Sequence, residues 1–379
     1  MKFRYITLIV YFVLSAFSLR AQTFTDSFVV DGIYRNYICH LPAGYSPAST
    51  YPLVLNLHGY TSNAVQQEAY TQMDGSADAH GYIVVYPNGV DSFWNSWGPA
   101  TGGPYGANDV KFLTELIDTI SQRYHVNQKR VYSCGISNGG YMTYALACAI
   151  TDRLAAVASV SGTMSNYTVS TCHPSRKIPV MHVHGTSDPI VPYTTGASLS
   201  IGVEQVMVFW RDTDACQHTT DTTDLANTNL ADGCTVQTIH YPHCAAGNDL
   251  LLYKIANGGH TWPGGAINIP LFGNTDRDIS GTDEIWKFFD RYTLDGPVAG
   301  VEEVSTISFA LYPDPATSTL IIAGVPDMAE ASVSDLMGHK VIAHIMGTQV
   351  DVSSLPGGIY TVQIQNDKGQ TGVLKFVKQ

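Results

Sequence analysis

The chain has 379 residues, of which 32 are acidic and 20 basic, giving a formal net charge of −12 at pH 7. This charge argues against a nucleic acid or an anionic membrane as partner, because both attract basic surfaces. The length exceeds that of an ordinary single domain, so we expect one large domain and one small one. Hydrophobic residues make up 45% of the chain, which is typical of a globular protein with a normal core.

The N-terminus is typical of a secretory signal peptide over residues 1–21. Lys2 and Arg4 give it a positive start, and the apolar run that follows is shorter than a membrane span. We expect cleavage after Ala21, which leaves Gln22 as the first mature residue. No later stretch is apolar enough to cross a bilayer, so we expect no membrane span in the mature protein.

Strand-like and helix-like segments alternate through the first three quarters of the chain. Polar and apolar residues alternate over 24–42 around Asp31-Gly32, which predicts an opening β-hairpin. An apolar stripe predicts a helix over 110–124, with Asp109 as its cap. This alternation predicts a mostly parallel sheet with helices on both faces. The other predicted strands are 53–57, 83–86, 130–133, 155–160, 180–184 and 250–255.

A glycine-rich turn, Gly135-Ile136-Ser137-Asn138-Gly139, separates a short β run from a helix-forming segment. A serine in such a turn takes a strained backbone conformation, for which its small neighbours make room. The turn exposes the Ser137 hydroxyl and places the next N–H at a helix N-terminus, where negative charge is stabilised. Ser137 is therefore a predicted nucleophile. The alternative is an ordinary turn with a capping serine.

A serine nucleophile needs a histidine to take its proton and a carboxylate to orient that histidine. Asp188 lies in the turn that follows the predicted strand at 180–184. His260 lies in a glycine-rich loop after the predicted strand at 250–255. Taken alone, Asp188 could be a turn-former and His260 a solvated loop residue. Together with Ser137, in the order serine, acid, histidine and each after a strand, they predict a catalytic triad.

The tetrahedral intermediate of acyl transfer also needs backbone donors for its negative oxygen. We expect the N–H groups of Asn138, directly after the nucleophile, and of Tyr60, in the loop after an early strand. Trp94 and Trp262 are candidates for substrate binding, since aromatic rings near such a site can stack on an aryl or sugar ring. Packing beneath long loops is the alternative for both. The polar segment 213–248 is expected to be an insertion over one side of the site.

No metal site and no cofactor are predicted. His182 and His184 alternate on a strand without a carboxylate cluster that would complete a site. Asp276, Asp278 and Asp283 precede a predicted helix, and capping and turn roles are favoured for them over calcium binding.

The seven cysteines include none with zinc-site spacing, and export would permit disulfides. An odd number leaves at least one cysteine unpaired, and Cys134 is expected to be a buried free thiol. The expected pairs are Cys148–Cys172 and one pair among Cys216, Cys234 and Cys244, with Cys216–Cys234 favoured over Cys216–Cys244.

Several stretches together resemble a known family: LHGYTSN from Leu57, GISNGG from Gly135, HGTSDPIVPY from His184 and GGHTWPGG from Gly258. Over about residues 28–292 the chain resembles the secreted esterases that group polyhydroxybutyrate depolymerase-like proteins with feruloyl and acetylxylan esterases. The resemblance implies an α/β-hydrolase fold with Ser137, Asp188 and His260 as the triad. It does not imply one substrate.

Beyond a turn-rich linker at 295–308 the composition changes to short β runs. The stretches LYPDPATSTL from Leu311 and VDVSSLPGGIYTVQI from Val350 resemble the C-terminal sorting domain of the type IX secretion pathway, with Asp314 in place of the usual asparagine. The resemblance implies a small all-β sandwich that contacts the type IX secretion machinery. The alternative is a carbohydrate-binding sandwich, although few aromatic residues are present to stack on sugar.

The predicted organisation is a signal peptide (1–21), an α/β-hydrolase domain (22–294), a linker (295–308) and a sorting domain (309–379). The predicted function is a serine esterase, secreted or attached to the outer surface, that acts on feruloyl or acetyl esters of plant polysaccharide. The first alternative is an extracellular polyhydroxybutyrate depolymerase. The second is an inactive surface protein that binds glycan or polymer.

Overall fold

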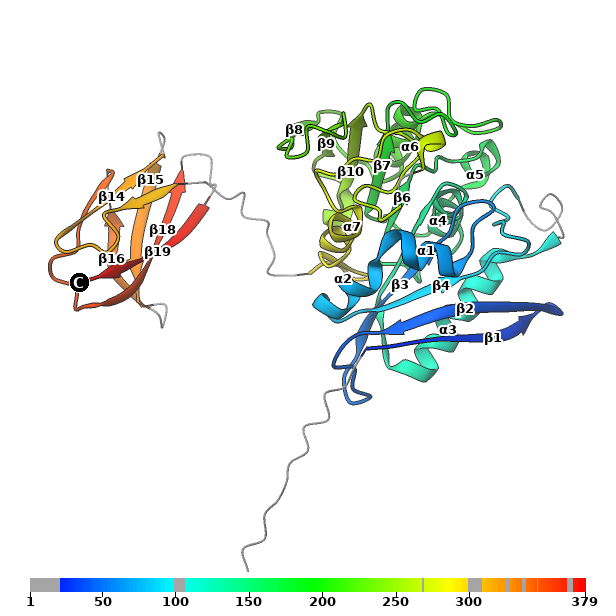
Figure 1. Cartoon of the computed structure of the whole chain (residues 1–379), viewed down its shortest axis with the longest axis horizontal. Helices are drawn as coiled ribbons and strands as arrows, with labels where there is room; N and C mark the ends of the chain where they lie inside the picture. Colours follow the sequence, from blue (N-terminus) through cyan, green and yellow to red (C-terminus); the bar gives the residue numbers. More distant parts are fainter. Residues whose placement is uncertain are drawn as a thin grey trace, which may run out of the picture. The chain divides into compact units, whose positions relative to one another are not determined.

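The computed structural model describes residues 21–98, 106–267, 269–298, 309–324, 328–335, 339–345, 347–366 and 371–379. The predicted signal peptide, apart from Ala21, and most of the predicted linker lie outside the described residues. The chain divides into two compact units, Met1–Val298 and Ala299–Gln379 (Figure 1). Within the described part of the chain, no helix has both the length and the apolar character needed to cross a membrane.

The first unit is built on a ten-stranded sheet in the order β1-β2-β4-β3-β5-β6-β7-β10-β9-β8 (Figure 1). Neighbouring strands from β4 to β10 in this order pair in parallel, and antiparallel strands flank them on both sides. The mostly parallel sheet predicted from the sequence is therefore confirmed. The strands are β1 (Gln22–Val30), β2 (Ile33–Leu41), β3 (Tyr51–Leu57), β4 (Ile83–Pro87), β5 (Val126–Ile136), β6 (Ala156–Val160), β7 (Val180–Gly185), β8 (Asp221–Asp224), β9 (Thr235–Tyr241) and β10 (Leu250–Ala256).

Helices cover both faces of this sheet, so successive strand residues enter two different cores. Leu53 and Leu55 pack in the core with α3, α4 and α6, whereas Val54 packs in the core with α2 and α7. Burial on both faces explains why the central strands are mostly apolar. The helices are α1 (Ala64–Thr71), α2 (Met73–His80), α3 (Asp109–Tyr124), α4 (Asn138–Ala149), α5 (Asn166–Thr171), α6 (Val203–Thr213) and α7 (Gly281–Phe289), with short 3-10 turns at Ala245–Gly247 and Pro270–Phe272.

The predicted opening hairpin is confirmed. The polar segment 213–248, which was expected to be an insertion, contributes strands to the sheet. β1 and β2 pair from Gln22 with Leu41 to Val30 with Ile33, around Asp31-Gly32 at positive φ. The polar segment instead forms β8 and β9, which extend the sheet beyond β10. All four residues of β8 are exposed, because this strand is the sheet's edge.

Cys148–Cys172 and one pair among Cys216, Cys234 and Cys244 are both confirmed, but the pairing favoured within the second group is wrong. Cys148 pairs with Cys172, but Cys216 pairs with Cys244 rather than with Cys234. The N–H of Gln217 donates to the Pro242 carbonyl, which brings the end of α6 beside the far end of β9. Cys234 precedes β9 and so lies a strand's length away, buried and free. Cys39 and Cys134 are also buried free thiols.

Asp109 is not the cap of α3. The Asn108 side chain caps the helix by accepting from the N–H of Lys111. Asp109 turns inward, where one carboxylate oxygen lies 2.6 Å from a guanidinium nitrogen of Arg35 and the other accepts from the N–H of Asn95. Both side chains of this ion pair are almost completely buried.

A buried charge that loses its partner is costly, so Asp109→Asn should lower the free energy of unfolding by about 3–5 kcal/mol. The matched control is Asp118→Asn, which breaks the half-exposed pair of Asp118 with Arg153. That change should cost less than about 1 kcal/mol. Denaturant titration of both variants measures the difference, and equal losses would contradict this role of Asp109.

The second unit consists of a three-stranded sheet, β13-β14-β17, and a four-stranded sheet, β16-β15-β18-β19. Side chains from both sheets, including Leu320, Val333 and Phe376, form one core, as in a small β-sandwich. The strands are β13 (Ala310–Tyr312), β14 (Thr319–Ala323), β15 (Met328–Ser334), β16 (Lys340–Ile345), β17 (Gln349–Asp351), β18 (Gly358–Asn366) and β19 (Thr371–Lys378). A short pairing of β11 (Tyr292–Thr293) with β12 (Gly296–Pro297) keeps the first part of the predicted linker within the first unit.

Candidate active site

The loops that follow β3 and β5 meet at the point where the sheet changes direction. After β3 the chain adds β4 on one side, and it then returns to add β5 on the other side of β3. Such a reversal opens a crevice at the carboxyl ends of the two strands. The loops are in close contact there, because a Cβ placed on Gly59 would lie 3.4 Å from the Cβ of Ser137.

Ser137 lies at the sharp turn between β5 and α4. Its φ of 56° and ψ of −122° are strained for a residue other than glycine. The turn is closed by the N–H of Ser137, which donates to the Val160 carbonyl. A Cβ on Gly139 would lie 2.2 Å from the Leu57 carbonyl oxygen, so this position requires glycine. The geometry is that of the nucleophile turn predicted from the sequence.

Asp188 and His260 come together at the ends of β7 and β10, which are neighbours in the sheet. His260 Nδ1 lies 2.8 Å from Asp188 Oδ2. Asp188 Oδ1 accepts from the N–H groups of Ile190 and Val191, each at 2.8 Å. Burial alone would raise the pKa of Asp188, but hydrogen bonds from His184 and His260 outweigh it and hold this pKa below its usual value. Asp188 is therefore a buried carboxylate that stays ionised at neutral pH.

A further buried chain of hydrogen bonds leads to Asp188 from helix α4. His184 Nε2 lies 2.8 Å from the Val191 carbonyl oxygen and 3.3 Å from Asp188 Oδ2. Because a carbonyl can only accept, this nitrogen carries a proton. His184 Nδ1 lies 3.1 Å from His182 Nε2, and His182 Nδ1 lies 2.7 Å from the Tyr144 hydroxyl. Burial, and then the neighbouring His184, hold the pKa of His182 well below its usual value.

From the sequence, the only role that His182 and His184 suggest is metal binding, which the lack of a carboxylate cluster does not favour. The signal for their actual contacts is the two-residue spacing on β7, which places both imidazoles on one face of the strand. The same spacing does not show which of them reaches Asp188. His184 is thus a residue of the candidate site that cannot be identified from the sequence spacing.

Ser137 and His260 line the same cavity, which has a volume of about 320 Å³. Tyr60 also lines it, from the loop after β3. Asn138 is the first residue of α4, so its N–H has no acceptor within the helix. The full lining comprises Gly59, Tyr60, Thr61, Ser62, Gln66, Gln67, Tyr70, Ile136, Ser137, His260, Ile267, Ile269 and Phe272.

Comparison with known proteins identifies the family to which the chain belongs. Residues 33–250, more than half of the chain, match the family described as Putative esterase. This chain belongs to that esterase family. The match includes Ser137 and Asp188 and ends before His260. Residues 310–379 match the Secretion system C-terminal sorting domain.

Two curated relatives of this chain carry esterase names. A bifunctional acetylxylan esterase/xylanase from Neocallimastix patriciarum is 29% identical over 73% of this chain and 36% of its own. Feruloyl esterase B from Piromyces equi is 28% identical over 60% of this chain and 42% of its own. The chain thus spans less than half the length of these two relatives.

A solved structure of acetyl xylan esterase from Aspergillus awamori supports the fold. It covers 71% of this chain and 98% of its own, with a TM-score of 0.50 and 15% identity. The α/β-hydrolase fold expected from the sequence is confirmed.

The two tryptophans predicted to bind substrate do not line the cavity of this esterase. Trp94 and Trp262 are both fully buried, with exposures of 0% and 1%. The Trp94 indole N–H donates to the His58 carbonyl at 2.9 Å, and its backbone makes two hydrogen bonds with the Asn138 side chain. The N–H of Trp262 donates to the Tyr70 hydroxyl at 2.9 Å. Both residues therefore support the cavity wall from behind, which corrects the prediction.

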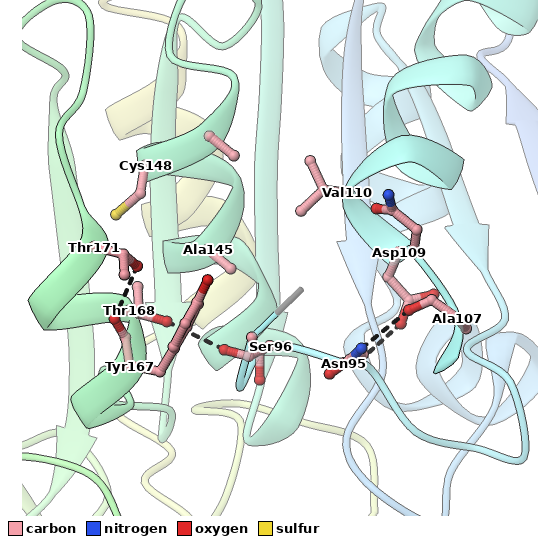
Figure 2. Close-up of a pocket in the computed structure, with 13 residues that line it drawn as sticks. Asn95, Ser96, Ala107, Asp109, Val110, Ala145, Cys148, Tyr167, Thr168 and Thr171 are labelled. Atoms are coloured by element: carbon pink, nitrogen blue, oxygen red, sulfur yellow. Dashed lines mark hydrogen bonds between the residues drawn. The ribbon is translucent and has the colours of Figure 1, made fainter. Parts of the chain in front are cut away.

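Figure 2 shows a second cavity of about 330 Å³, between α3, α4 and α5. Asn95 and Ser96 line it, and the Thr168 hydroxyl donates to the Ser96 carbonyl at 3.1 Å. It shares no lining residue with the first cavity and contains neither Ser137 nor His260. The candidate active site of the esterase is therefore the first cavity.

We expect His184 to hold Asp188 in position. His184→Phe removes a hydrogen bond to a charged group, so kcat on an ester substrate should fall about tenfold with little change in KM. The matched control is Tyr144→Phe, which removes only the hydrogen bond between Tyr144 and His182, farthest from Asp188. This change should leave kcat within about twofold. Steady-state kinetics test this, and equal losses in the two variants would contradict a specific role for His184.

Proposed function

We propose that this protein is a secreted serine esterase that cleaves feruloyl or acetyl esters of plant polysaccharide, with Ser137, His260 and Asp188 as its triad. One observation carries the proposal. A serine at a strained strand-to-helix turn shares a cavity with a histidine whose Nδ1 lies 2.8 Å from a buried carboxylate. This arrangement suits acyl transfer through a covalent intermediate.

In the proposed reaction the Ser137 oxygen attacks the ester carbonyl carbon while His260 Nε2 takes the hydroxyl proton. The N–H groups of Asn138 and Tyr60 stabilise the resulting oxyanion. Its collapse breaks the bond to the alcohol, which receives the proton from His260. Water then attacks the acyl-enzyme with His260 again as base, releasing the acid and restoring Ser137. Each step uses only side chains, backbone and water, so no cofactor is required.

The cavity suits a small acyl group with an aromatic or apolar body. Tyr70 and Phe272 supply ring surfaces, and Ile267 and Ile269 add aliphatic surface at the same site. A volume of about 320 Å³ lies at the lower end of the range for small-molecule sites. The names of the acetylxylan and feruloyl esterase relatives support the same choice.

The C-terminal unit supports export of the enzyme. Its match to the sorting domain and its sandwich of two small sheets suit a module that contacts the type IX secretion machinery. The proposed location is therefore the cell surface or the surrounding medium, where a polysaccharide substrate is accessible.

A polyester depolymerase is the second candidate, and one surface feature favours it. Apolar side chains at and next to the cavity are exposed, including Ile267 at 45% and Leu271 at 77%. Such a rim could contact the surface of a solid polymer. An inactive binding protein is the third candidate, against which the complete set of Ser137, His260 and Asp188 argues.

Activity on a substrate panel tests the proposal. Wild-type protein should release acid from methyl ferulate or acetylated xylan faster than from p-nitrophenyl butyrate, and Ser137→Ala should lose at least about 10³-fold of this activity. Clearing of amorphous polyhydroxybutyrate without ferulate or acetate release would favour the depolymerase instead. Failure of a fluorophosphonate to label Ser137 in the folded protein would overturn the hypothesis that the protein is a serine esterase.

Phe272 offers a sharper test of the acyl group. Phe272→Ala should reduce kcat/KM for methyl ferulate about tenfold and leave that for an acetyl ester within about twofold, because only the larger acyl group reaches the ring. The matched control is the neighbouring Leu271→Ala, since Leu271 does not line the cavity. Equal losses on ferulate and acetate would show that Phe272 does not contact the aryl group.

A further inference from the structure

Three carboxylates from two distant segments meet beside the loop that carries His260. Asp232 precedes β9, whereas Asp276 and Asp278 lie between the 3-10 turn at Pro270–Phe272 and α7. One oxygen atom from each lies within 4.8 Å of the other two. Ser280 caps α7, so neither Asp276 nor Asp278 has the predicted capping role. Asp276 does have a turn role, because its Oδ2 accepts from the N–H of Ile279 at 3.4 Å.

Backbone donors hold all three carboxylates, and within the described part of the chain one oxygen each of Asp276 and Asp278 is left without a donor. Asp278 Oδ1 accepts from the N–H groups of Thr228 and Asn229, and Asp232 accepts from the N–H of Arg277 at 2.7 Å. Asp278 Oδ2 and Asp276 Oδ1 are buried, and neither has a hydrogen-bond partner among the described residues. The Asp276 side chain is the critical one, because the residue is only 1% exposed. A buried carboxylate oxygen without a donor is unfavourable unless a cation binds it.

No basic side chain of the described residues compensates this charge. Arg277 stands between two of the acids in sequence, but its guanidinium donates to the Gly265 carbonyl at 3.0 Å. The cluster thus has the charge and the free oxygens of a cation site.

We propose that Asp232, Asp276 and Asp278 bind a calcium ion. The candidate ligands are all carboxylate oxygens, which hard cations prefer. They come from irregular loop segments, and calcium tolerates irregular geometry better than magnesium does.

The ion would join two segments that position the catalytic histidine. The N–H of Gly264 donates to the Asp276 carbonyl, and the N–H of Gly259 donates to the Asn274 carbonyl, each at 2.8 Å. The segment with Asp276 and Asp278 therefore runs beside the His260 loop. Asp232 would tie this pair of segments to the connection between β8 and β9. Binding of the ion does not depend on the reaction proposed above.

The test uses the full chain after removal of metal with a chelator. Calcium should bind with a Kd between micromolar and millimolar in calorimetric titration. Saturating Ca²⁺ should raise the Tm of the esterase unit by about 5 °C. Asp276→Asn should abolish both effects. In chelator this variant should unfold no earlier than the wild type, because it removes a buried unpaired charge.

The matched control is Asp283→Asn, an acid in the first turn of α7 that lies outside the cluster. It should retain the full calcium response, and Asp278→Asn serves as a second cluster variant. Absence of a calcium response in the wild type would overturn the proposal, as would an unchanged response in Asp276→Asn. An equal Tm shift with Mg²⁺ would overturn the choice of calcium.

Discussion

Contact between backbone segments at the turn after β5 is the constraint on which the candidate site depends. A Cβ on Gly135 would lie 2.7 Å from the backbone of Gly139, so the two glycines of the motif lie against each other. This contact leaves Ser137 no alternative to its strained conformation. The main chain therefore fixes the position of the Ser137 hydroxyl. The other strands of the sheet must place His260 and the loop after β3 beside it.

The sheet does this through the neighbouring ends of its parallel strands, and buried polar contacts hold each loop there. Trp94 links the loop after β3 to the start of α4, because it bonds both His58 and Asn138. Asp188 is held by two backbone N–H groups in addition to two histidines. Preorganisation of this kind limits the reorganisation that charge development would otherwise require.

The parts of the site that could be predicted from the sequence are those whose chemistry is local. Ser137 is marked by its own glycine neighbours, and Asp188 and His260 by turns that directly follow strands. The positions that were wrong depend on contacts between distant segments. The position of Asp109 before an apolar stripe predicts a cap, but its side chain pairs with Arg35, which is 74 residues away. Trp262 follows His260 by two residues, yet packing decides on which side of the cavity wall its ring lies.

The disulfide error has the same origin. Cys234 is nearer to Cys216 in sequence than Cys244 is, but the return of the chain along β9 reverses their order in space. The cluster of Asp232 with Asp276 and Asp278 likewise joins residues that no local pattern connects. Sequence spacing alone therefore underestimates how much of this unit is held together by contacts at the ends of the sheet.

The exposed edge strand β8 has a consequence for how this protein meets other copies of itself. An open sheet can in principle continue growing, because its last strand still has unpaired backbone groups. Here that last strand is only four residues long and begins and ends with the carboxylates of Asp221 and Asp224. If a second copy paired with β8 edge to edge, the negative charges of the two strands would lie close together, and only a few backbone hydrogen bonds could form. The polar residues of β8, which resemble a loop in the sequence, thus protect this edge of the sheet from intermolecular pairing.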